Sequence, residues 1–249
     1  MQTTSETGHA KNVANFEALV SFCTGYGTTY NPSRDALKFA NLQTVLTAAK
    51  AALAECKTTE TIFDNATDAR AEAFAPLQSL STRIVTALAV SGVAKTVADG
   101  ARTINRKLQG KRANSSPKLT PAVKEGETAP AGPATKSSSQ LSYDSLVEHF
   151  NGLIELVGSH AEYTPNETEL NITPLLNYLS TLKAANTAVI NAYTVWSNSR
   201  LIRNEILYAG STGLVDIALD VKGYIKSVFN ATSPQYGQVK GIAFKKPKE

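Results

Sequence analysis

The sequence predicts an all-α protein built as two tandem, elongated helical bundles joined by a Pro- and Ser-rich linker. The first observation behind this prediction is hydrophobic periodicity. Residues 33–75 and 175–209 contain no glycine or proline, and apolar residues recur in both stretches every three or four positions. That spacing is typical of helices, whereas strands show alternation. At 1.5 Å per residue, either stretch would form a helix about 50–60 Å long.

The second observation is an internal duplication. A shift of 133 positions aligns residues 30–77 with residues 163–210 without a gap, and twelve of these 48 pairs are identical. Residues 16–20 align with 143–147 at a shift of 127, which predicts six more residues near the start of the second copy. A helix fixes side-chain direction by position, so matched residues should occupy matched core sites. The expected core residues are Leu42, Leu46, Ala49, Ile62, Phe63 and Phe74, matched in order to Leu175, Leu179, Leu182, Val195, Trp196 and Leu207.

The third observation is the composition of residues 111–140, which hold four of the ten prolines, many serines and threonines, and no aromatic residue. Such a segment cannot bury enough apolar surface to offset the entropy lost on ordering. It is expected to be a flexible linker and the domain boundary. The predicted domains are therefore residues 12–110 and residues 141–244, the second with a basic tail.

Local signals set the expected helix ends. Ser33 and Asp35 mark the start of the first long helix, and Thr173 with Pro174 marks the start of the second. Pro76 is expected to end the first. The shorter helices that follow are expected over 77–90, 94–108 and 214–229, and residues 233–249 are expected to form a turn and an extended tail.

Composition argues against catalysis and against bound metals or cofactors. The chain has two cysteines, Cys23 and Cys56, and three histidines, too few for a disulfide framework or a Cys/His zinc site. No nucleotide-binding, hydrolase, metalloprotease or CxxC motif occurs. The sequence therefore predicts no catalytic, metal-ligating or cofactor-binding residue, and a protein that is not an enzyme.

Several polar residues keep their places in both copies. They are Asn65, Arg70 and Glu72 in the first, and Asn198, Arg203 and Glu205 in the second. A structural role is favoured over a pair of ligand-binding positions: the arginine stem would pack while its head pairs with a carboxylate or with helix-end carbonyls.

Basic residues gather after each predicted bundle, in segments 102–118 and 240–248, while the bundles are mildly acidic. The candidate anion contacts are Arg102, Arg106, Lys107, Lys111, Arg112 and Lys118. They would either contact nucleic acid or an anionic surface, or complement a helix dipole and keep the linker soluble.

A resemblance adds a source but no activity. Residues 30–32 (Tyr-Asn-Pro), 41–50 (Asn-Leu-Gln-x-x-Leu-x-x-Ala-Lys) and 231–241 (Ala-Thr-Ser-Pro-Gln-Tyr-Gly-Gln-Val-Lys-Gly) resemble those of duplicated helical proteins predicted in Bacteroidota genomes. That family has no assigned activity, so the resemblance implies a bacterial source and no site residues.

The leading functional hypothesis is a structural or protein-interaction module that binds a protein partner or associates with itself. The alternatives are nucleic-acid or anionic-surface binding through 102–118 and 240–248, and a membrane-active helical protein. The apolar run 84–94 has eleven residues, whereas a membrane span needs roughly 20. With no transmembrane segment expected and no signal-peptide pattern at residues 1–16, a cytoplasmic location is expected.

Overall fold

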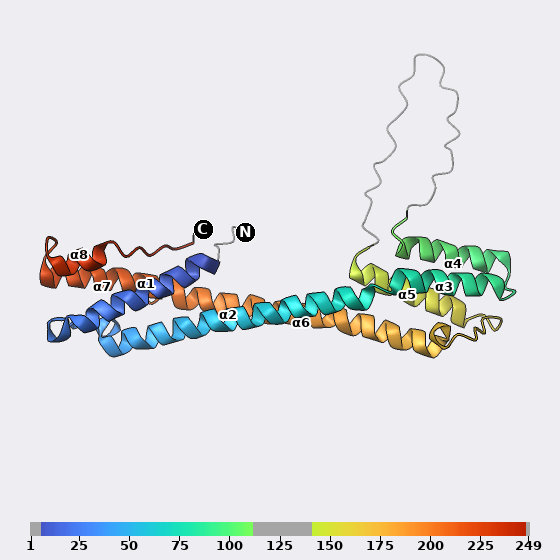
Figure 1. The fold of residues 1–249 in the computed structure, drawn as a ribbon, viewed down its shortest axis with the longest axis horizontal. Coiled ribbons are helices and arrows are strands. Elements are labelled where there is room, and N and C mark those ends of the chain that lie inside the picture. Colours follow the sequence, from blue (N-terminus) through green and yellow to red (C-terminus); the bar gives the residue numbers. More distant parts are fainter. Residues whose placement is uncertain (1–5, 112–140, 248–249) are drawn as a thin grey trace, which may run out of the picture. The chain divides into compact units, whose positions relative to one another are not determined.

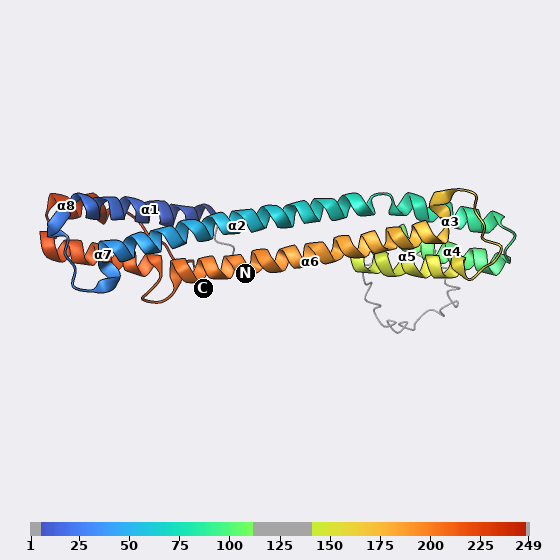
Figure 2. The same ribbon diagram turned by 90° about the horizontal axis from the view of Figure 1, so that it is seen from below.

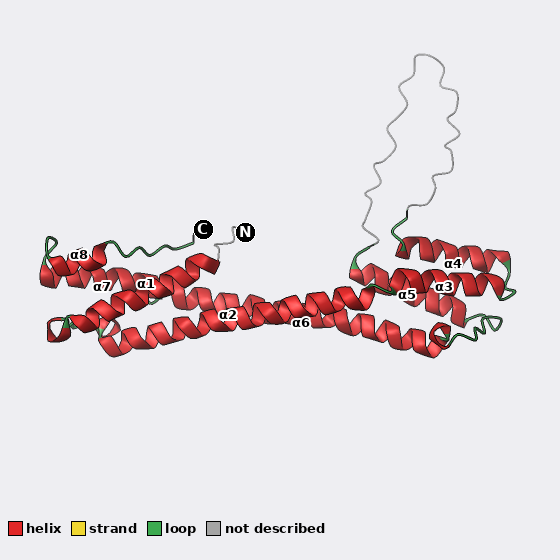
Figure 3. Cartoon of the chain, in the orientation of Figure 1, coloured by secondary structure: helices red, strands yellow, loops and turns green. Residues whose placement is uncertain are grey.

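The computed structural model describes residues 6–111 and 141–247, and within them every regular element is a helix (Figures 1 and 3). The prediction of an all-α protein is confirmed. Of the predicted linker, residues 111–140, all but Lys111 lies outside the described residues. The elements are α1 (Glu6–Gly25), α2 (Phe39–Phe74), α3 (Leu77–Val90), α4 (Lys95–Leu108), α5 (Tyr143–Gly158), α6 (Ile172–Tyr208), α7 (Leu214–Phe229) and α8 (Pro234–Lys240), with short 3-10 helices at Gly27–Thr29, Asp35–Leu37 and Thr168–Leu170.

The chain forms two compact units that differ from the predicted domains 12–110 and 141–244. Unit 1 comprises residues 1–65 and 191–249, and unit 2 comprises residues 66–190. Each unit therefore combines segments from both predicted copies. The reason is that α2 and α6 are continuous helices, and each contributes one part to unit 1 and the other part to unit 2.

In unit 1, α7 packs against α1 and α8 (Figures 1 and 2). The side chains of Thr59 on α2 and Ser199 on α6 form a buried hydrogen bond, with their Oγ atoms 2.8 Å apart. The core of unit 1 comprises Val13, Phe16, Leu19, Val20, Cys23, Tyr30, Leu37, Leu42, Leu46, Ala49, Leu207, Leu214, Val215, Ile217, Ala218, Val221, Ile225 and Val239.

In unit 2, α4 packs against α3 and α5. The hydroxyl of Tyr178 donates to the carbonyl of Ala73 at 2.8 Å and so joins α6 to the end of α2. The core of unit 2 comprises Phe74, Leu77, Ile84, Val85, Leu88, Ala101, Leu108, Phe150, Leu153, Ile154, Val157, Tyr163, Leu170, Leu175, Leu179 and Leu182.

Burial confirms four of the six predicted pairs of core positions. The confirmed pairs are Leu42/Leu175, Leu46/Leu179, Ala49/Leu182 and Phe74/Leu207. Ile62 and Val195 are instead 51% and 52% exposed, because that face of each long helix is not covered within its unit. Phe63 and Trp196 are only partly buried. Their rings stack on each other with centroids 5.2 Å apart, so Trp196 is mostly buried, as expected, although it belongs to neither core cluster.

The buried residues of α1 and α5, the first helices of the two predicted copies, are related by a different shift from the predicted 127 positions. Phe16, Leu19 and Val20 are buried in α1, and residues 150, 153 and 154 are buried in α5. Their shift is 134 positions, whereas the shift of 127 would match buried residues of α1 to partly exposed residues of α5. The burial pattern therefore does not support six additional residues near the start of the second predicted copy.

The structure confirms the predicted bounds of two helices and corrects one segment. The helices α3 and α7 have the predicted bounds, 77–90 and 214–229. Residues 234–240 form α8 rather than a turn, because the side chain of Ser233 caps the helix by accepting from the N–H of Tyr236 and Pro234 occupies its first turn. In the described part of the tail, residues 241–247 lack regular structure, as predicted.

Candidate functional site

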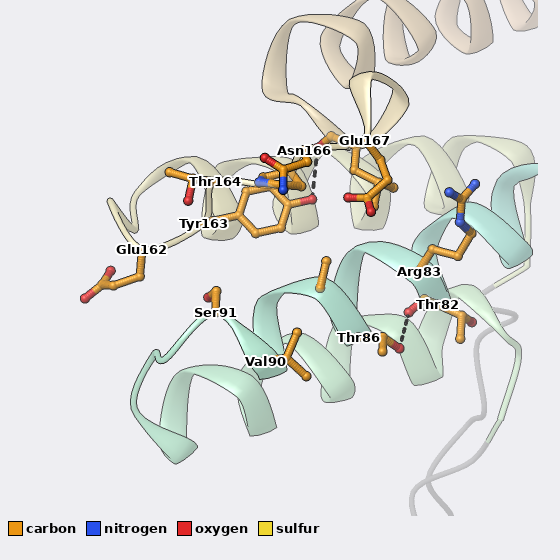
Figure 4. Close-up of a pocket in the computed structure, with 13 residues that line it drawn as sticks. Thr82, Arg83, Thr86, Val90, Ser91, Glu162, Tyr163, Thr164, Asn166 and Glu167 are labelled. Atoms are coloured by element: carbon orange, nitrogen blue, oxygen red, sulfur yellow. Dashed lines mark hydrogen bonds between the residues drawn. The ribbon is translucent and has the colours of Figure 1, made fainter.

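Unit 2 contains a hollow of about 560 Å³ between α3 and the segment 162–170 (Figure 4). Residues of α3 that line it include Thr86, Ala87 and Val90, and Tyr163 forms part of the opposite wall. Tyr163 is buried, and its hydroxyl donates to the carbonyl of Leu170 at 2.9 Å. Burial raises the pKa of Tyr163 to about 12, so the phenol stays neutral and keeps this bond at physiological pH.

The charged side chains at this hollow are mostly acidic. Arg83 donates to Glu169 at 2.5 Å, and this bond lowers the pKa of the Glu169 carboxyl. Glu162 and Glu167 also line the hollow and are exposed. Together these four side chains carry a net charge of about −2 when ionised. The hollow therefore has one buried aromatic wall and an acidic rim.

The sequence did not predict this hollow, and none of the candidate residues lies in it. The pattern Tyr-x-Pro occurs at residues 30–32 and again at 163–165, and the second occurrence lines the hollow. Tyr30 makes the same bond in unit 1 as Tyr163 makes in unit 2, from its hydroxyl to the carbonyl of Leu37 at 2.7 Å. The pattern therefore marks the turn that leads into each long helix.

The repeated arginines have different surroundings. Arg70 donates to the side-chain oxygen of Asn186 at 3.1 Å, and its guanidinium carbon lies 4.0 Å from the ring centroid of Tyr143. The expectation of a carboxylate or a helix-end carbonyl as its partner is thus wrong, because an amide and an aromatic ring occupy the available space. Arg203 is 2% exposed and donates from Nε and Nη2 to the side-chain oxygen of Asn204.

The other repeated polar residues lie on the surface. Asn65, Asn198, Glu72 and Glu205 are all exposed. Their exposure gives them no part in either core, so burial within the units does not account for their repetition.

The described basic residues of segment 102–118 belong mainly to the end of α4. Arg102 pairs with Asp99 one turn earlier at 2.7 Å. Arg106 and Lys107 lie in the last turn of α4, where cations stabilise the negative end of the helix dipole. Lys111 is exposed, and Arg112 and Lys118 lie outside the described residues.

The second basic segment, 240–248, is held partly by backbone contacts and an ion pair. Lys246 pairs with Asp216 of α7 at 2.7 Å. Asn12, a buried residue of α1, donates to the carbonyl of Lys245 at 2.8 Å and accepts from the amide of Lys245 at 3.1 Å. Its side chain also lies 3.2 Å from the hydroxyl of Tyr208. Asn12 therefore attaches the segment 241–247 to α1.

Asn12→Ala is expected to loosen the segment 241–247 without unfolding α7. The change removes both bonds to the backbone of Lys245, so the N–H and the carbonyl of Lys245 lose this partner. Hydrogen exchange at the amide of Lys245 should accelerate at least tenfold, a loss of about 1.4 kcal/mol of protection. Asn15→Ala is the control, because half-buried Asn15 donates to the carbonyl of Ala243 and should have a smaller effect. Equal effects of the two changes would contradict the role of Asn12.

The described residues contain no group of three or more His, Cys, Asp or Glu side chains that could hold a metal ion. Cys23 and Cys56 are buried free thiols, and burial raises the pKa of Cys23 to about 11. One stretch, residues 39–90, is long and apolar enough by length and composition to cross a membrane, and 33% of its most apolar window is buried within the protein. It includes the break between α2 and α3.

Comparisons with known proteins add no assignment. No family model, curated protein or solved structure matches the chain.

Proposed function

We propose that this chain is a non-enzymatic structural protein that associates with a second copy of itself through the helix stripe, defined as Val195, Asn198 and Ile202 of α6. The observation that carries the proposal is the exposure of core-type residues at matched positions of both copies. Val195 and Ile202 are 52% and 57% exposed, and Ile62, the match of Val195, is 51% exposed. Covering large exposed apolar side chains with a partner lowers the free energy, because their surface is removed from water.

The spacing of the helix stripe fits a helical partner. Its members are three and four residues apart, so they lie on one face of α6 at the spacing of successive contacts in a coiled coil. In the first copy, Ile62 and Asn65 repeat the first two positions with the same spacing. Leu201, next to the stripe, is 65% exposed and adds apolar area.

A second copy is the occupant that the chemistry favours. Residues 184–199 of α6 contain no charged side chain, so a copy approaching this stretch meets no like charge there. The side chain of an asparagine both donates and accepts, so Asn198 can pair with Asn198 of another copy across a twofold axis. An asparagine in such a seam fixes the register of the helices. This role would account for the repetition of an asparagine at 65 and 198.

We also infer that the chain arose by duplication. The 3-10 helices at 35–37 and 168–170 are 133 positions apart, as are the starts of α2 and α6. Matched bonds from Tyr30 and Tyr163 hold the turns before both helices. The matched cores of the two units give further support, because the same facing is preserved over most of the long helices.

The test is the mass of the protein in solution, measured by light scattering over a roughly hundredfold range of concentration. We expect a dimer that dissociates on dilution. Ile202→Lys should give a monomer at every concentration, because a buried unpaired charge opposes association. Leu219→Lys on α7 is the matched control, since Leu219 is 50% exposed but outside the stripe, and it should leave the dimer intact.

A monomeric wild-type protein at every concentration would contradict the proposal, and so would equal effects of the two lysine variants. Asn198→Leu adds a sharper reading. It should strengthen association but relax its stoichiometry, so that species larger than a dimer appear. If Asn198→Leu leaves the dimer unchanged, Asn198 does not lie in the interface.

A further inference from the structure

The hollow of unit 2 has a counterpart in unit 1 that a tyrosine ring occupies. The helices α3 and α7 match at a shift of 137 positions, which pairs three sets of buried residues: Leu77 with Leu214, Ile84 with Val221, and Leu88 with Ile225. The same shift pairs Ala87, which lines the hollow, with Tyr224. It also pairs Arg83 with Asp220. Arg83 forms an ion pair with Glu169 in the segment before α6, and Asp220 forms one with Arg34 in the segment before α2.

Tyr224 shows how a phenol is held at this place. Its ring meets the ring of Tyr30 edge to face, with centroids 5.4 Å apart and planes at 89°. Such pairs contribute stability beyond the burial of their area. The hydroxyl of Tyr224 accepts from the backbone N–H of Asn31 at 3.2 Å. One aromatic wall and one backbone donor thus position the phenol.

Unit 2 keeps the wall and the donor but lacks the ring. Tyr163 stands in the place of Tyr30, with the same bond to the carbonyl seven residues later. Thr164 stands in the place of Asn31, and its N–H turns back to the carbonyl of Glu162 at 3.0 Å. Ala87, which lines the hollow, offers only a methyl group at the position that matches Tyr224 of unit 1.

We propose that the hollow between α3 and residues 162–170 binds a phenol ring that carries a positive charge, with the ring in the position that Tyr224 takes in unit 1. The ring packs against Tyr163, and its hydroxyl accepts from the N–H of Thr164 after the bond to Glu162 is released. The positive charge follows from Glu167, which lines the hollow while Arg83 is already paired with Glu169. Tyramine is the simplest molecule with this chemistry, and a tyrosine beside lysines in a peptide is the other source.

The first measurement is a titration of the full chain with tyramine, followed by NMR or calorimetry. We expect one site, with Kd in about the millimolar range for so small a ligand. The anionic 4-hydroxyphenylacetate and phenethylamine, which lacks the hydroxyl, should both bind several-fold more weakly. A peptide Gly-Lys-Tyr-Lys-Gly that binds more tightly than tyramine would assign the ring to a protein partner, and a weaker one would assign it to a free small molecule.

Two variants decide whether binding occurs in the hollow. Ala87→Tyr supplies the ring from within and should weaken tyramine binding at least tenfold, while α7 shows that a tyrosine is tolerated at the matched position. Ser79→Tyr, exposed on α3 and outside the lining of this hollow, should bind like the wild type.

Failure of the wild type to bind tyramine at a concentration tenfold above the expected Kd would overturn the proposal, and so would unchanged binding by Ala87→Tyr. A thermal melt of each variant shows whether it is folded. The comparison of Ala87→Tyr with Ser79→Tyr decides the question. Neither result depends on self-association, because the hollow and the helix stripe share no residue.

Discussion

Phe16→Ala is expected to destabilise unit 1 by about 3–5 kcal/mol, the range for a fully buried phenylalanine. Phe16 is 0% exposed and lies in one cluster with Leu207 and Leu214 from the other end of the chain. Hydrogen exchange should therefore accelerate in residues 214–229 and stay slow in residues 77–108. Two tandem domains would give the opposite pattern, because residues 77–108 belong to the same predicted copy as Phe16.

The matched control is Phe150→Ala, which removes the equivalent ring from unit 2. Phe150 is also 0% exposed and clusters with Leu77 and Ile84. Exchange should now accelerate in residues 77–108 and stay slow in 214–229. Faster exchange in both helices for either variant would show that the two units unfold together, and a pattern that follows the tandem domains would contradict the division of the chain into these units.

The helices could be predicted from the sequence because their signals are local. Pro76 and the Ser91-Gly92 pair bound α3, and its predicted ends agree with the structure. The pairing of helices could not be predicted in this way. A repeat indicates that two segments fold alike, but the same apolar faces can be covered by helices of their own copy or of the other copy.

Exposure of Ile62 and Val195 has a similar explanation. The register correctly placed them at matched positions, and they are exposed to nearly the same degree. It could not tell which face of each helix is covered, because apolar residues lie on several sides of α6, including Tyr193 and Leu201. Equivalence was therefore predictable, while burial depends on which helices pack there.

The hollow could not be predicted because it results from a missing side chain. Its recognition requires matching α3 to α7, and the ungapped register ends just before these helices, where 77 would align with 210. The change from 133 to 137 comes from one more residue at the end of α6 than at the end of α2, and from three more residues in the loop 209–213 than in the break 75–76. A search for the shift of 137 through Leu77 and Leu214 would have paired Ala87 with Tyr224.

Ala69→Pro is expected to lower the free energy of unfolding by about 3 kcal/mol or more. Ala69 is exposed and lies inside α2, which continues without a break from residue 39 to residue 74. Proline there removes the N–H that bonds to the carbonyl of residue 65 and its ring clashes with that carbonyl. Since the alanine methyl makes little contact, the loss would come from the helix backbone rather than from packing.

Ala69→Gly separates these two causes. It also removes the methyl group but keeps the N–H, so it should cost only about 1 kcal/mol, mostly through backbone entropy. Urea denaturation of both variants, followed by circular dichroism, gives the comparison. If α2 were instead two helices joined near residue 66, where the units divide, proline at 69 would lie in a first helical turn, and the two variants would have nearly equal stability.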